Sequence, residues 1–165
     1  MDTLQNIASF ESSSVIGTFK KNFNVTTEEA SDIFRETKKW LYLCQLAQQS
    51  AFSQPTPPRM VITKELSIID EMWHAFILNT RDYHDFCANL LGTFIHHVPI
   101  LTDTPSIDIS GSREVSSERA AQRLKEMRAQ LLFTQKHLGN STLKKWYGHY
   151  AKHYTPEKIK ALSIK

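Results

Sequence analysis

The sequence contains little glycine, proline or cysteine. Five of the 165 residues are Gly and six are Pro, which excludes collagen-like and low-complexity chains. The two cysteines, Cys44 and Cys87, are too few for a disulfide framework in a chain of this length. Both lie in apolar stretches, where a free cysteine behaves as a small buried hydrophobe. We therefore expect a reducing compartment.

The sequence also lacks long apolar runs and a strong excess of one charge. No window reaches the roughly 18 consecutive apolar residues that indicate a membrane span, and the N-terminal residues do not form a secretory signal peptide. We expect a cytoplasmic protein, although a protein exported without a signal peptide would share these features. The formal net charge of +3 is too small to indicate a nucleic-acid partner.

The chain does contain enough apolar residues for a packed core. Hydrophobic residues make up 41% and charged residues 22%, and a length of 165 residues corresponds to one domain. Apolar residues recur at helical spacing, and no stretch shows the alternation of a strand. The sequence therefore predicts an all-α fold, with residues 1–165 as a single compact domain of five or six helices and a core at about 14–154.

Capping signals and loop residues divide this pattern into elements. Thr26 and Glu29 form a capping box at the start of the longest helix, and Gly92 suits the end of a later one. Residues 93–115, rich in Thr, Ser, Pro and Asp, are expected to form a long flexible loop. We expect helices over residues 14–22, 26–49, 63–91 with a break at 79–82, 116–138, 142–154 and a C-terminal tail helix at 156–163.

One segment carries most of the chemical signal. Asp70 and His74 are four residues apart on a predicted helix, so their side chains are neighbours. Gly92 lets the chain turn back, which would bring His97 or His96 to the same pair. Two imidazoles and one carboxylate suit zinc, or non-haem iron with open coordination positions. We therefore predict a zinc or iron site at Asp70, His74 and His97.

Further side chains belong to this prediction. His84 lies on the same helical stripe as Asp70 and His74, so it is a further candidate ligand, as is His96. Trp73, Tyr83 and Arg81 are the expected contacts of a bound small molecule or protein. The segment then forms a metal- or ligand-binding domain.

The same pair also has a structural interpretation. Asp70 could simply accept a hydrogen bond from His74 and fix its ring at the edge of the core. The chain would then be a non-catalytic protein-interaction module, such as a bacterial regulator or effector. A metal site needs an open coordination position and a pocket, whereas an interaction module needs an exposed apolar patch.

A longer pattern in this segment consists of Asp70, Trp73, His74, Phe76, Ile77, Leu78, Tyr83, Cys87, Gly92, His97 and Pro99. This pattern resembles the segment shared by glycine-rich-domain-containing-protein-like (GRDP-like) domains, which occur in plant proteins and in short bacterial proteins. The resemblance implies that Asp70, Trp73, His74, Tyr83 and His97 form the functional set. With only five Gly in the chain, any role of a glycine-rich region does not transfer.

Two further groups have a functional and a structural interpretation. Cys87 and His84 could act as nucleophile and base, but the position of Cys87 on an apolar stripe favours a buried structural thiol. The aromatic and basic residues of 142–154, Trp146 and Tyr150 among them, could stack on bases, but their spacing favours a core helix. No nucleotide-binding or hydrolase motif is present, so the sequence leaves open whether the protein is an enzyme.

Overall fold

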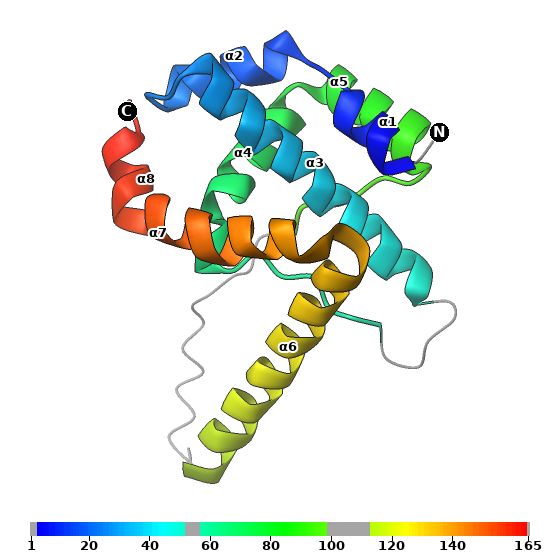
Figure 1. The fold of residues 1–165 in the computed structure, drawn as a ribbon, viewed down its shortest axis with the longest axis vertical. Coiled ribbons are helices and arrows are strands. Elements are labelled where there is room, and N and C mark those ends of the chain that lie inside the picture. Colours follow the sequence, from blue (N-terminus) through cyan, green and yellow to red (C-terminus); the bar gives the residue numbers. More distant parts are fainter. Residues whose placement is uncertain (1–2, 52–56, 99–112, 165) are drawn as a thin grey trace.

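Helix α3 is the element around which the other helices of the computed structural model are arranged (Figure 1). It contacts α1, α2, α4 and α6. The structure describes residues 3–51, 57–98 and 113–164, without the side chains of 113–118. In chain order the helical elements are α1 (Thr3–Ser9), α2 (Ser13–Asn22), α3 (Thr27–Ser50), the 3-10 helix η1 (Lys64–Leu66), α4 (Ser67–Leu78), α5 (Thr80–Phe86), the π-helical turn η2 (Cys87–Leu91), α6 (Arg113–Lys144), the π-helical segment η3 (Lys145–Tyr150), α7 (Ala151–His153) and α8 (Pro156–Leu162).

The prediction of an all-α fold in a single compact domain is confirmed. The described residues contain no strand, and one isolated bridge joins Phe23 to Ser163. The described part of the chain holds more helical segments than the five or six expected. Helix α1 was not predicted, and the break at Asn79 together with short 3-10 and π-helical segments divides the predicted helices further. None of the described helices is long and apolar enough to cross a bilayer.

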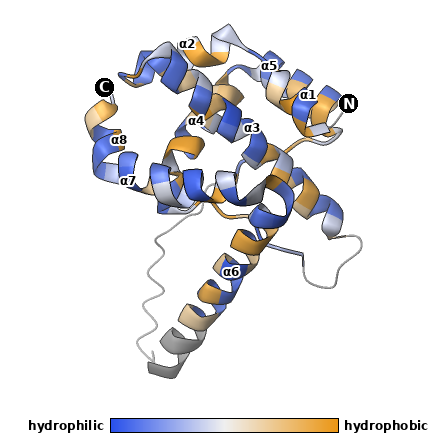
Figure 2. Cartoon of the chain, in the orientation of Figure 1, coloured by the Kyte–Doolittle hydropathy of each residue, from blue (hydrophilic) through white to orange (hydrophobic). Residues whose placement is uncertain are grey.

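Helix α3 begins where the capping signal predicts. The Thr26 side chain accepts a hydrogen bond from the Glu29 backbone N–H at 3.1 Å, which satisfies one of the free donors at the helix start. The Glu29 carboxylate accepts from the Tyr154 hydroxyl at 2.6 Å, so this residue joins α3 to the C-terminal region. Figure 2 shows hydrophobic and hydrophilic residues alternating along α3, as in the amphipathic helices that line a core.

Helix α1 lies outside the predicted core but is tied to α3 by a buried lysine. Lys38 is 3% exposed. Its ammonium donates to the carbonyl oxygen of Ala8, in the last turn of α1, and to that of Phe10, just after this helix. Ile7 of α1 is fully buried. A seven-residue helix with one buried apolar side chain has too little periodicity to be found from sequence.

The predicted break between α4 and α5 is present at Asn79. Its backbone leaves the helical region, and its side-chain amide donates to the carbonyl oxygen of Ala75 and to the Thr18 hydroxyl. After η2, Gly92 adopts a left-handed conformation with φ of 68°, which agrees with the predicted C-terminal cap. The chain then turns back, and Ile95 re-enters the core.

Helix α6 begins at Arg113, three residues before the predicted start at Ser116. Its N-terminal part projects from the rest of the molecule (Figure 1). Gly139, with φ of 79° and ψ of 172°, makes the kink that separates this part from the one packed on α3. Of the predicted loop at 93–115, residues 99–112 lie outside the described residues.

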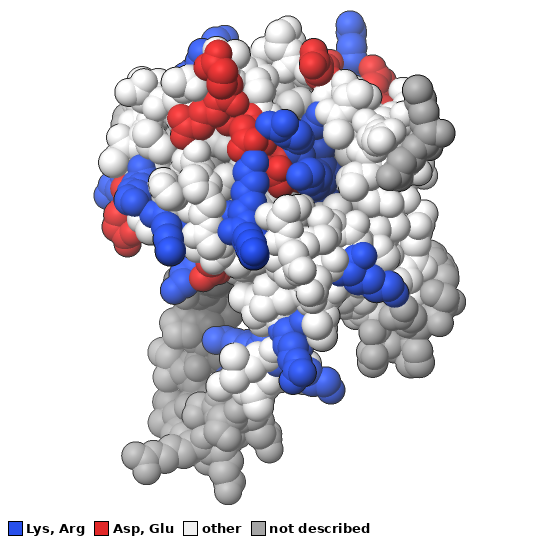
Figure 3. Space-filling view, viewed as in Figure 1, with Lys and Arg blue, Asp and Glu red and all other residues white. Residues whose placement is uncertain are grey.

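A network of acidic residues on α3 holds the C-terminal region. Glu36 is 1% exposed and accepts from the Trp146 indole N–H at 2.8 Å. Lys145 Nζ lies 2.6 Å from Asp32 Oδ1 and 3.3 Å from Glu36 Oε1. Burial opposes the charge on Asp32, but the hydrogen bond and charge of Lys145 outweigh it and lower the pKa of Asp32. Figure 3 shows acidic and basic side chains interspersed on this face. The aromatic residues here are core residues, as their spacing favoured.

Candidate metal centre

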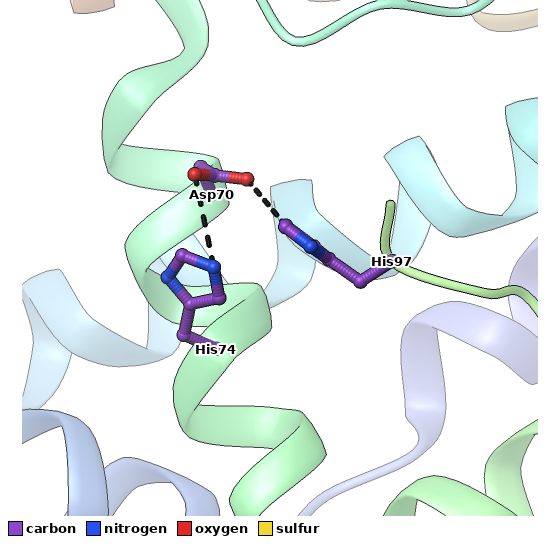
Figure 4. Close-up of side chains that lie close together, drawn as sticks. All are labelled: Asp70, His74 and His97. Carbon is purple, nitrogen blue, oxygen red and sulfur yellow. Dashed lines mark hydrogen bonds and ion pairs between the residues drawn. The ribbon is translucent and has the colours of Figure 1, made fainter. Parts of the chain in front are cut away.

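Asp70, His74 and His97 lie together at the surface of α4 (Figure 4). Asp70 and His74 stand on successive turns of α4, and His97 comes from the segment that follows Gly92. Asp70 Oδ1 lies 2.8 Å from His97 Nε2, and Asp70 Oδ2 lies 3.9 Å from His74 Nε2. One ligand atom from each of the three residues lies within 4.8 Å of the other two. Helical spacing and the turn at Gly92 thus bring these residues together.

A buried hydrogen-bond chain holds the segment that carries His97. The Trp73 indole N–H donates to the Tyr83 hydroxyl at 3.0 Å, and this hydroxyl donates to the carbonyl oxygen of Ile95. Burial raises the pKa of Tyr83, so its hydroxyl remains a donor. The Trp73 ring also packs edge-on against His97, with centroids 4.4 Å apart. Trp73 and Tyr83 therefore position a candidate ligand.

The cluster is partly accessible to solvent. The side chain of His74 is 48% exposed, that of Asp70 is 29% exposed and that of His97 is 14% exposed. His74 is the most exposed of the three, whereas His97 is held by Trp73 on one side and by the Asp70 carboxylate on the other. Glu71 Oε2 lies 3.9 Å from His74 Nδ1, so a second carboxylate borders the cluster. The i,i+3 spacing of Glu71 and His74 could have shown this from sequence.

The cluster borders a cavity of about 850 Å³ that the sequence did not indicate. Its other walls come from the end of α3 and from residues 57–62, which are distant from Asp70 in sequence. Cys44 lines this cavity, and burial raises the pKa of its thiol to about 12, so it is protonated at neutral pH. A protonated thiol is a poor metal ligand and a poor nucleophile.

The remaining predicted site residues lie outside the cluster. His96 is exposed and lines the same cavity, with its ring near Phe94. His84 is exposed on α5 beside Asp85, and Arg81 is exposed on the same helix. Cys87 is buried, as its place on the apolar stripe favoured.

The fold and the cluster together define a small all-α domain with a histidine–aspartate site at one edge. A family model described as UCP032817-like matches residues 4–107, and the chain belongs to this family. The matched region runs from the second residue of α1 past α5 and contains all three residues of the cluster. No curated protein and no solved structure matches the chain.

The predicted membership of the GRDP-like family is wrong. The family model that matches is a different one, and it covers more than half of the chain. The pattern that suggested GRDP-like domains combines apolar and aromatic residues at helical spacing, the polar pair Asp70 and His74, and a following Gly92 and His97. Amphipathic helices that carry a polar pair at one edge are common, so a match on such residues has low specificity.

Proposed function

We propose that this chain is a metal-binding helical domain in which Asp70, His74 and His97 bind zinc or ferrous iron. The observation that carries the proposal is the meeting of three ligand atoms from two separate elements within 4.8 Å. Two imidazoles and one carboxylate are a ligand set used for zinc and for non-haem iron.

The distances in the cluster are compatible with an ion of this size. Donor atoms about 2.1 Å from a tetrahedral zinc ion are roughly 3.4 Å apart. The separations of 2.8 Å between His97 Nε2 and Asp70 Oδ1 and 3.9 Å between His74 Nε2 and Asp70 Oδ2 lie on either side of this value, and one donor atom from each residue lies within 4.8 Å of the other two. Small side-chain rotations, mainly of the half-exposed His74, would bring all three atoms onto one ion.

Three protein ligands leave a coordination position open. Closed structural zinc sites use four protein ligands, whereas sites that bind water or a substrate use three. The cluster also opens onto a cavity large enough for a small molecule. These two features favour a site that exchanges ligands over a site that only stabilises the fold.

Zinc titration of tag-free protein, followed by calorimetry, tests the proposal. The parent should bind one equivalent, and His74→Ala should lose this binding. His84→Ala is the matched control, because His84 is an exposed histidine of the next helix that lies outside the cluster. Binding that survives in His74→Ala, or that disappears in His84→Ala, would contradict the proposed ligands.

A structural role for the same residues is the second candidate. The 2.8 Å contact between His97 and Asp70 favours it, because this hydrogen bond already joins the segment after Gly92 to α4. The chain would then be an interaction module, and the exposed Leu124 and Leu132 of the projecting α6 would be available to a protein partner. Under this candidate, chelator and added zinc leave the melting temperature unchanged, whereas a metal-binding domain melts higher with zinc.

A further inference from the structure

The cavity beside the cluster is mostly apolar. The end of α3, residues 57–62 and residues 95–98 form its walls. A volume of about 850 Å³ lies within the range of small-molecule sites. Its apolar lining includes Trp40, Cys44, Met60, Ile62 and Ile95.

Asp70, His74 and His97 form a compact polar group in this lining, and Arg59 is another charged member of it. With a divalent ion bound, the carboxylate of Asp70 leaves one positive charge among the groups that line the cavity, to which Arg59 adds another; Glu71, 3.9 Å from His74, lies outside this lining. The positive charge of a bound ion in a mostly apolar cavity favours a ligand with one anionic end and an apolar remainder.

We infer that this cavity binds an aliphatic monocarboxylate, with its carboxylate on the open coordination position of the metal and its chain against the apolar walls. The inference rests on the proposed metal site, because the ion supplies the charge that holds the carboxylate. A carboxylate oxygen is an ordinary ligand of zinc, so it can take the position that three protein ligands leave open.

The chemistry of the walls determines which carboxylates bind well. Each methylene moved from water into an apolar site strengthens binding by about fourfold, which corresponds to about 0.8 kcal/mol. Affinity should therefore rise from acetate through butyrate and hexanoate to octanoate. A carboxylate held only at the surface would show no such dependence on chain length.

The first arm of the test measures zinc alone, and the second measures the carboxylates on zinc-loaded protein, both by calorimetry. The expected result is binding of one equivalent of zinc and then a rise in affinity with chain length. Octylamine is the matched control for charge, and it should bind much more weakly than octanoate. His74→Ala, which removes a zinc ligand, should lose the octanoate binding that the parent shows.

A second variant separates the cavity from the metal. Ala51 is an exposed residue of the cavity wall at the end of α3, so Ala51→Trp places a large side chain there without disturbing the core. This variant should bind zinc as the parent does and should bind octanoate about tenfold more weakly, because the chain and the indole compete for space.

The possible results distinguish the two proposals. If the parent binds neither zinc nor, in the same titration without oxygen, ferrous iron, the proposed function is wrong and the inference fails with it. If zinc binds but acetate and octanoate bind equally, the metal site stands and the inference is overturned. It is also overturned if octylamine binds as well as octanoate, if octanoate binds apo and zinc-loaded protein equally, or if Ala51→Trp binds octanoate as the parent does.

Discussion

His97 Nε2 lies 2.8 Å from Asp70 Oδ1, and this contact joins the segment after Gly92 to the first turn of α4. The two residues are 27 positions apart in sequence. The same two atoms are candidate metal ligands, so the hydrogen bond holds them near the positions that an ion would require. This preorganisation lowers the cost of ordering the ligands when a metal binds.

Asp70→Asn separates the hydrogen bond from the metal site. The amide oxygen still accepts from His97, so the free energy of unfolding should change by less than about 1 kcal/mol. The negative charge is lost, so zinc affinity should fall by more than about tenfold, since removal of even an outer partner costs that much. Calorimetry and urea denaturation measure the two effects. Equal zinc affinity in Asp70→Asn would exclude Asp70 as a ligand.

Tyr83→Phe tests the hydrogen-bond chain beneath the cluster. The change leaves the buried Trp73 N–H and the Ile95 carbonyl without their shared partner, so the free energy of unfolding should fall by about 1–3 kcal/mol. Zinc affinity should also fall, because the segment carrying His97 is less firmly held. Tyr42→Phe is the control, since the Tyr42 hydroxyl has no hydrogen bond within the described residues. A stable Tyr83→Phe protein with unchanged zinc affinity would show that Tyr83 does not position His97.

Glu36→Leu should be strongly destabilising. Glu36 is buried and accepts from Trp146 at 2.8 Å and from Lys39 at 2.9 Å. Its removal leaves the buried Trp146 N–H and the partly buried Lys39 ammonium without this acceptor, so we expect a loss of about 3–5 kcal/mol in chemical denaturation, the range for breaking a buried charged pair. Glu36→Gln keeps an oxygen for Trp146 and should lose less. Similar losses in the two variants would mean that the charge, and not the hydrogen bonding, is the main contribution.

Lys38 should make stability depend on pH in the alkaline range. Burial lowers its pKa from 10.5 to about 8, against the opposing charge of Glu11. The unfolded chain therefore holds the Lys38 proton more tightly than the folded chain between pH 8 and 10.5. Stability should rise with pH across this interval relative to Lys38→Met, which lacks the group. Melting temperatures of both proteins at several pH values measure the difference. Parallel curves for the two proteins would contradict the lowered pKa.

Gly139 and Gly17 form a matched pair of glycine positions. Gly139 has φ of 79°, a conformation that other residues adopt only with strain, so Gly139→Ala should cost about 1–3 kcal/mol. Gly17 lies inside α2 with no atom within 4 Å of an added Cβ, so Gly17→Ala should stabilise by about 0.5–1 kcal/mol. Thermal unfolding measures both. A neutral Gly139→Ala would show that the kink of α6 does not depend on this glycine.

Local signals in the sequence predicted most elements of the fold. Thr26 marks the start of α3, the Thr155–Pro156 pair marks the start of α8, and Gly92 marks the end of η2. Each acts only on nearby backbone: the threonine side chains accept from free N–H groups at a helix start, and the glycine adopts the left-handed conformation that ends a helix. The same local rules placed Asp70 and His74 on adjacent turns. They could not find α1, whose position depends on Lys38 donating to its carbonyl groups from another helix.

By itself, the sequence determined the helical class and the pairing of Asp70 with His74, since both follow from residue spacing along one helix. The sequence named His97 as the third member and His84 and His96 as further candidates, and only the tertiary structure showed that His97 meets the pair while the other two do not. That outcome depends on Tyr83 and Trp73, which hold Ile95 in the core and fix where the chain passes α4. The cavity beside the cluster likewise depends on the tertiary structure, because its walls come from segments far apart in sequence. The packing of these segments depends on shape complementarity, which residue spacing does not encode.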